Sequence, residues 1–251
     1  MSAAIVWPLA LAVLGTIFGS FIAALVIRWP QGRSVMRGRS ACDGCGRPLC
    51  AGELVPLLSF AVQHGRCRGC GARIDPWHAG IELAASAIGL AAGIVAPDAG
   101  GIAGAVFGWL LLALAALDVI AFWLPDRLTG LLAATGLAAG VAGLDPSLVD
   151  RLIGGIAGYA SLALIAWGYK AARGHDGMGG GDPKLFGAIG LWLGWRMLPA
   201  VLVIASLIGL GVALFAHLTG RGVARDTALP FGALLAVAAY PAWLAMISLA
   251  P

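Results

Sequence analysis

The sequence predicts an all-α polytopic membrane protein of about eight transmembrane helices. Of its 251 residues, 60% are hydrophobic and only 11% are charged, whereas a soluble domain carries about 25% charged residues. Too few polar side chains are present to cover a water-facing surface, and the high hydrophobicity excludes a disordered chain. The apolar residues are grouped in runs near the 20 residues that a membrane-spanning helix needs.

The first run, Ile5–Ile27, is too long for a cleavable signal peptide, has no basic segment before it and no small-residue cleavage site after it. We therefore expect it to remain as a membrane helix. Beyond a polar segment the runs are separated by short breaks at Pro, Asp and Arg residues. The further predicted spans are 79–97, 101–122, 128–144, 151–171, 183–195, 198–218 and 229–249.

The basic residues predict the orientation. The polar segment from Arg28 to His78 holds eight of the 16 Lys and Arg, and eight spans place six more on the same side. Since cytoplasmic loops carry the excess of positive charge, this side is predicted to be cytoplasmic and both termini periplasmic. The expected domains are a first transmembrane helix (1–28), a small cytoplasmic domain (29–78) and a seven-helix membrane domain (79–251).

Four cysteines in the cytoplasmic domain predict a structural zinc knuckle between the first two transmembrane helices. They form two Cys-x-x-Cys pairs with 21 residues between them, Cys42 with Cys45 and Cys67 with Cys70, close to the spacing of a four-cysteine zinc site. A pair of disulfides is disfavoured in the reducing cytoplasm, and no strand–helix pattern supports a redox motif. Cys50 is a further thiol that could replace one ligand.

Two aspartates stand out as candidate catalytic residues. Asp118 lies inside an apolar run, where a carboxylate costs about 2.5–3.5 kcal/mol on insertion scales and is normally functional. Asp182 follows a glycine-rich stretch that includes Gly179 and Gly181, and it precedes Pro183 at a predicted helix start. The predicted topology places both at the cytoplasmic ends of their spans, as an aspartic dyad requires.

Two neighbouring charges are weaker candidates. Asp126 follows Pro125 at a helix end, where water is near, so its carboxylate is less costly to keep. Lys184 could stabilise a carboxylate or contact a peptide backbone, or could extend its amine to the membrane interface. A transporter that uses Asp118 and Asp182 as a proton or cation relay is the alternative, and a scaffold protein that docks a partner through the knuckle is a third.

These motifs, taken in order, resemble those of the type IV prepilin peptidases, which are bacterial aspartyl proteases of the GxGD type. The similar segments are Gly19-Ser20-Phe21, the two cysteine pairs around Glu53–Phe60, Asp118 with Leu124–Thr129, Gly179–Leu185, and Pro230-Phe231-Gly232. Two departures are Ala23-Ala24, where an Asn is usual, and Ala233, where a second Pro is common.

The resemblance implies an endopeptidase that removes the basic leader from prepilins or pseudopilins at the cytoplasmic face of the inner membrane, for a type IV pilus or type II secretion system. Asp118 and Asp182 match the catalytic aspartates, with Asp126 in support. Many members also N-methylate the new N-terminus with S-adenosylmethionine, and the cysteine domain is present here as it is in those bifunctional members. The partners expected are pilin precursors and the lipid bilayer, with no nucleic acid.

Overall fold

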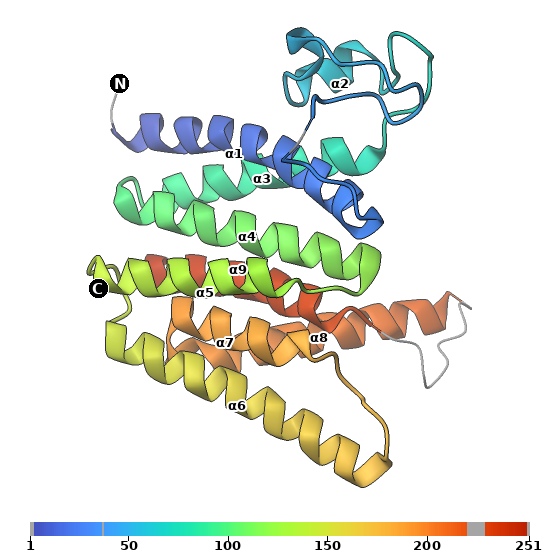
Figure 1. Cartoon of the computed structure of the whole chain (residues 1–251). Helices are drawn as coiled ribbons and strands as arrows, with labels where there is room; N and C mark the ends of the chain where they lie inside the picture. The colour runs from blue at the N-terminus through green and yellow to red at the C-terminus, as the bar shows by residue number, and fades with distance from the viewer. Residues whose placement is uncertain (1–2, 37, 220–228, 250–251) are drawn as a thin grey trace. The chain divides into compact units, whose positions relative to one another are not determined.

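The computed structural model describes residues 3–36, 38–219 and 229–249, which form nine α-helices and three short 3-10 helices without a β-strand. The bounds of the α-helices are α1 (Ala3–Arg28), α2 (Leu58–Val62), α3 (Pro76–Val95), α4 (Ala99–Ala121), α5 (Asp126–Val141), α6 (Leu148–Arg173), α7 (Gly181–Leu193), α8 (Leu198–Leu218) and α9 (Phe231–Ser248). The 3-10 helices are η1 (Trp29–Gln31), η2 (Ala51–Glu53) and η3 (Trp195–Met197) (Figure 1).

The predicted fold class is confirmed, because an α-helix lies at each of the eight predicted apolar runs. Six helices of the described residues are long and apolar enough to cross a membrane: α1, α3, α4, α6, α8 and α9. The helices α5 and α7 have 16 and 13 residues, or about 24 and 20 Å at 1.5 Å per residue, against a hydrocarbon core of about 30 Å. The number of eight spans therefore stays a prediction.

The chain forms two compact units, residues 1–113 and 114–251, which we describe separately. The sequence-based domains 1–28, 29–78 and 79–251 stay predictions. In the first unit α1 and α3 lie side by side, with the loops of the cysteine segment at one end (Figure 1). A methyl group on Gly19 of α1 would lie 2.7 Å from the Cα of Glu82, and one on Gly93 of α3 would lie 2.6 Å from the Cα of Pro8. The absence of side chains at these positions allows the two backbones to approach closely.

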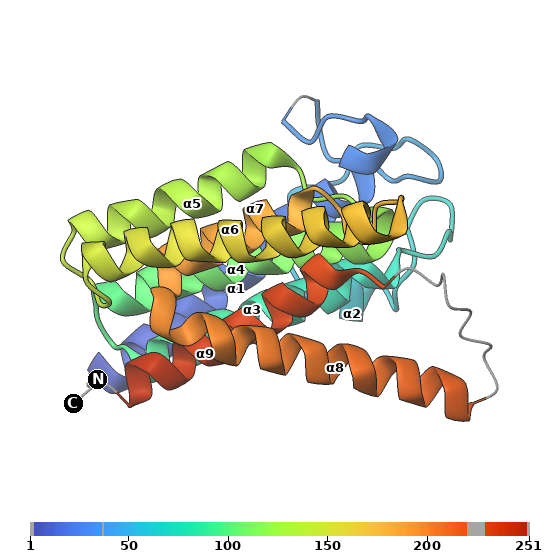
Figure 2. The same cartoon turned by 90° about the horizontal axis from the view of Figure 1, so that it is seen from below.

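The second unit is built around α7, which buries ten of its 13 residues. Glycines again permit the contacts: a methyl on Gly158 of α6 would lie 2.7 Å from the carbonyl oxygen of Phe186. Trp192 of α7 donates from Nε1 to the carbonyl of Leu132 in α5 at 2.8 Å. The helices α8 and α9 lie side by side (Figure 2). This packing holds the N-terminus of α7, with Asp182, at a fixed place in the unit.

Candidate functional site

Two carboxylates are buried in the second unit, and they are the two aspartates that the sequence predicts as catalytic. Asp118 lies in the last turn of α4, and Asp182 lies in the first turn of α7. Their exposed fractions are 5% and 6%. A carboxylate in the first turn of a helix is favoured by the helix dipole, which accounts for the position of Asp182 but not for that of Asp118.

The two aspartates meet at the first turn of α9. The backbone N–H of Ala233 donates to Asp118 Oδ2 at 2.8 Å. A methyl group placed on Gly232 would lie 3.0 Å from Asp118 Oδ2 and 3.1 Å from Asp182 Oδ1, so each oxygen is within van der Waals reach of the same point. Residues 64 positions apart in the sequence thus face one small space.

The glycines before Asp182 shape this space. The N–H of Asp182 donates to the carbonyl of Gly179 at 3.2 Å, which forms a tight turn into α7. A methyl on Gly181 would lie 2.8 Å from Leu124 Cβ, and one on Gly179 would lie 3.3 Å from Asp182 Oδ2. Side chains at these two positions would press on Leu124 and on the carboxylate, whereas a methyl at Gly180 would meet no described atom within 4 Å.

The proximity of two carboxylates has an electrostatic consequence. Two like charges this close repel each other in a buried setting, so the pair is more stable when it holds one proton than when both groups are ionised. One carboxylate can then accept a proton while the other donates one. This is the arrangement that acid–base hydrolysis of a peptide bond by water requires.

Lys184 and Asp126 form an ion pair with each other. Lys184 Nζ lies 2.7 Å from Asp126 Oδ1, and both side chains are about half exposed or more. The described contacts of Lys184 therefore join it to Asp126 rather than to Asp118 or Asp182. An exposed pair of this kind is worth about 0–1 kcal/mol.

The first unit holds a cluster of four thiols, as the sequence predicts. The Sγ atoms of Cys42, Cys45, Cys67 and Cys70 all lie within 4.8 Å of one another, and Cys42 and Cys70 are 3.9 Å apart. Tetrahedral zinc with bonds of about 2.3 Å holds its sulfurs about 3.8 Å apart, while a disulfide requires about 2.0 Å. The cysteines are free, and the cluster could hold a metal ion; Cys50 lies outside it.

Each cysteine pair sits on a turn of the same shape. Gly46 and Gly71, which follow the second cysteine of each pair, both have φ of +70°, a left-handed conformation that glycine adopts without strain. The N–H of Gly46 donates to Cys42 at 2.8 Å, and the N–H of Gly71 donates to Cys67 at 2.9 Å, in both cases to the carbonyl oxygen. Two equivalent turns thus present four thiols to one point.

Neighbouring groups favour the ionised form of the Cys67 thiol and rigidify the knuckle. The backbone N–H groups of Cys70 and Gly69 point to Cys67 Sγ and lower the pKa of this thiol to about 6, which favours the thiolate that a metal binds. Arg47 donates to Glu53 Oε1 at 2.6 Å and holds the pKa of that carboxyl below its usual range. The other oxygen of Glu53 accepts from the N–H of Cys50 at 2.9 Å, so Glu53 ties the knuckle to η2.

The sequence patterns predicted no role for two charged residues that are buried in the structure. Glu82 of α3 lies within an apolar run, as Asp118 does, and it is 6% exposed. The cost of a carboxylate in lipid was the signal in the sequence that could have identified it as a candidate site residue. Arg151 stands at the start of the predicted span 151–171, and it is 1% exposed. Its guanidinium donates to six backbone carbonyls around the ends of α5 and α7: those of Gly136, Leu144, Asp145, Pro146, Leu191 and Trp192.

These features define a polytopic helical membrane protein with a buried pair of aspartates and a four-cysteine centre. Two protein families match the sequence: the bacterial peptidase A24 N-terminal domain over residues 13–95, and the type IV leader peptidase family over residues 105–214. The first match contains all four clustered cysteines, and the second contains both Asp118 and Asp182.

Several relatives bear the name prepilin leader peptidase/N-methyltransferase. The protein of Aeromonas hydrophila is 39% identical over 217 residues, which are 85% of this chain and 73% of the relative. That of Burkholderia pseudomallei strain 1026b is 45% identical over 201 residues, which are 79% of this chain and 64% of the relative. That of Klebsiella pneumoniae is 36% identical over 207 residues, which are 80% of this chain and 91% of the relative. No solved structure matches the chain.

The chain belongs to the type IV leader peptidase family. Its apolar helices and its relatives indicate an inner-membrane protein. The comparisons support a peptidase and give no support to the transporter that the sequence left open.

Proposed function

We propose that this protein is an aspartyl endopeptidase that removes the basic leader from prepilins or pseudopilins at the cytoplasmic face of the inner membrane. The observation that carries the proposal is the meeting of Asp118 and Asp182 beside Gly232, although 64 positions separate them in the sequence. The names of the relatives and the family match support the substrate class.

The two aspartates divide the work of hydrolysis. The ionised carboxylate takes a proton from a water molecule, whose oxygen attacks the carbonyl carbon of the scissile bond. The protonated carboxyl polarises that carbonyl, and the leaving amine of the mature pilin receives a proton as the carbon–nitrogen bond breaks. Both side chains are buried and lie against the first turn of α9, so neighbouring residues must move for a substrate to reach them.

The neighbouring residues have supporting roles. Gly179 and Gly181 keep the turn before α7 slim enough for Asp182 to approach Gly232. The ion pair of Asp126 and Lys184 joins the start of α5 to the start of α7, and we assign it to positioning. The cysteine cluster holds a structural zinc ion, because four thiolates leave no open coordination position for catalysis.

The distribution of Lys and Arg supports a knuckle on the cytoplasmic side and both termini in the periplasm. The names of the relatives also support a second activity, N-methylation of the new pilin N-terminus. When bound, S-adenosylmethionine supplies a methyl group for the amine nitrogen. No nucleic acid takes part in either reaction, and the protein meets its substrate within the bilayer.

Asparagine at either aspartate tests the peptidase. Asp118→Asn and Asp182→Asn keep the size of the side chain but remove its acid–base function, so either change abolishes leader removal from a prepilin by the detergent-solubilised protein. Asp176→Asn is the matched control, because Asp176 is an exposed aspartate in the loop before α7. Normal processing by both dyad variants would refute the assignment, provided that their melting temperatures match the wild type's.

A further inference from the structure

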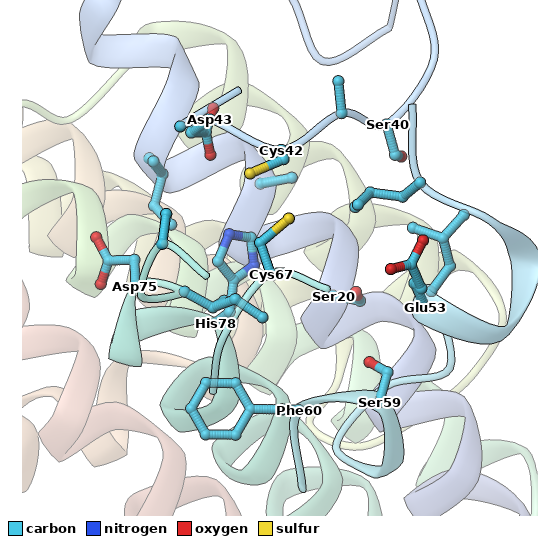
Figure 3. A pocket seen from close by; sticks show the side chains of 18 of the residues that line it. Ser20, Ser40, Cys42, Asp43, Glu53, Ser59, Phe60, Cys67, Asp75 and His78 are labelled. Atoms are coloured by element: carbon cyan, nitrogen blue, oxygen red, sulfur yellow. The ribbon is translucent and has the colours of Figure 1, made fainter. Parts of the chain in front are cut away.

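The aspartate pair lies outside the cavity of the first unit. That cavity, of about 350 Å³, adjoins the cysteine turns, and Cys42, Cys67 and His78 line it (Figure 3). Neither Asp118 nor Asp182 contributes to its wall. In the second unit the two carboxylates are instead buried, so the access of a peptide bond to them depends on the side chains that cover them.

Leu124 is one of these covering side chains. It lies between α4 and α5 and is half-buried. A methyl group on Gly181 would lie 2.8 Å from Leu124 Cβ, and one on Gly232 would lie 2.7 Å from Leu124 Cδ1. The same methyl on Gly232 would lie 3.0 Å from Asp118 Oδ2 and 3.1 Å from Asp182 Oδ1. One leucine therefore packs against both glycines and borders the point that the two carboxylates share.

The backbone on either side of Leu124 fixes its position. The N–H of Phe122 donates to the carbonyl of Asp118 at 2.9 Å, and Phe122 has a φ of +48°, a left-handed conformation that residues other than glycine rarely adopt. This turn ends α4 one turn after Asp118. Three residues beyond Phe122, the carbonyl of buried Pro125 accepts from the N–H of Thr129 at 3.1 Å at the start of α5. Since the connection is held at both ends, the fold determines where the Leu124 side chain lies.

A peptide bond cannot reach the two carboxylates while every side chain stays in place. Reacting atoms must come within about 3–3.5 Å of each other, whereas a single methyl on Gly232 would already lie 2.7 Å from Leu124 Cδ1. The carboxylates are needed for the reaction, and Gly181 and Gly232 belong to the backbones of α7 and α9. The leucine side chain can move by a change of rotamer, without loss of a hydrogen bond. Leu124 is therefore the group whose displacement costs the least free energy.

We propose that Leu124 is a specificity-determining residue of the peptidase, which limits the size of the substrate residue that lies against the aspartates at the scissile bond. The inference rests on the proposed function. A substrate side chain takes the space that Leu124 leaves, and protein interiors are packed so densely that one methylene matters. A small residue enters with little displacement, whereas a large one forces Leu124, α7 or α9 to shift further.

Internal competition between prepilins tests the inference. Two series of one prepilin carry Gly, Ala, Val or Leu, in the first series at the residue before the scissile bond and in the second at the residue after it. Pairs of substrates compete for the purified, detergent-solubilised protein, and the ratio of products gives the ratio of their kcat/KM values. This ratio does not depend on how much of the sample is folded.

We expect the wild type to favour small residues in at least one series, and Leu124→Ala to relieve that preference. One methylene in an apolar pocket changes selection by about 10–200-fold, so the relative kcat/KM of the substrates with Val or Leu should rise at least about tenfold. Leu131→Ala is the matched control, because Leu131 lies on α5 in the same unit and is 48% exposed. It should give the wild-type ratios.

The outcomes separate this inference from the proposed function. A wild type that cleaves no prepilin overturns both. A wild type that cleaves all members of both series equally well, or a Leu124→Ala protein with the wild-type ratios, overturns the role of Leu124 and leaves the peptidase. So does a folded Leu124→Ala protein that cleaves no prepilin, because Leu124 would then be needed for the reaction itself.

A second variant covers the case in which alanine prevents folding. Leu124→Val removes one methylene and keeps an apolar side chain in the connection between α4 and α5. It should shift the same ratio in the same direction as alanine would. An unchanged ratio in a folded Leu124→Val protein overturns the inference.

Discussion

A single methyl group added at Gly232 tests the geometry of the aspartate pair. In Gly232→Ala the methyl carbon would lie 2.7 Å from Leu124 Cδ1, 3.0 Å from Asp118 Oδ2 and 3.1 Å from Asp182 Oδ1. Carbon atoms in contact prefer about 3.5–4.0 Å, so the start of α9 or its neighbours must move by roughly 1 Å. The N–H of Ala233, which donates to Asp118, moves with it.

The expected loss of activity is larger than the loss of stability. Overpacking costs about 1–3 kcal/mol, and alanine regains up to about 1 kcal/mol of helix propensity over glycine. A displacement of about 1 Å at reacting groups costs about a hundredfold in rate. We therefore expect kcat for leader removal to fall about a hundredfold, with the protein still folded at the assay temperature.

The assay is cleavage of a prepilin by purified protein in detergent, with kcat and KM measured separately and melting followed in parallel. Gly180→Ala is the control, since a methyl there meets no described atom within 4 Å and its φ of −64° suits alanine; it should retain the wild-type rate. A Gly232→Ala protein with wild-type kcat would refute the packing of both carboxylates against this glycine.

The remaining predictions concern the parts that support the site. Arg151→Met removes the donors to six backbone carbonyls, all in buried or part-buried hydrogen bonds, and should lower the free energy of unfolding by about 3 kcal/mol; a wild-type melting temperature in detergent would contradict this. Cys67→Ser should lose the single zinc ion while Cys50→Ser retains it, as measured by metal analysis; equal metal in both would exclude the four-thiol site. A double-mutant cycle of Asp126→Asn and Lys184→Met should give a coupling of at most about 1 kcal/mol in thermal unfolding, and a larger value would show a stronger role for the pair.

The sequence by itself determined the membrane class and the places of the long helices. Apolar runs near 20 residues form helices in lipid, because only internal hydrogen bonds satisfy the backbone there. It also determined the cysteine cluster, since the Cys-x-x-Cys spacing with a following glycine specifies a local turn. Both patterns depend on residues that are close together in the sequence. For this reason the predicted helix positions and the predicted cluster of four thiols agree with the structure.

Contacts between distant residues needed the tertiary structure. The sequence indicated that Asp118 and Asp182 share a depth, but only the packing of α7 and α9 brings both carboxylates to Gly232. The partner of Lys184, the six carbonyls around Arg151 and the hydrogen bond from Leu57 to Glu82 depend on side-chain directions between segments that lie far apart in the chain. Hydropathy records whether a residue tends to lie in lipid or in water, and it carries no information on which buried groups face one another.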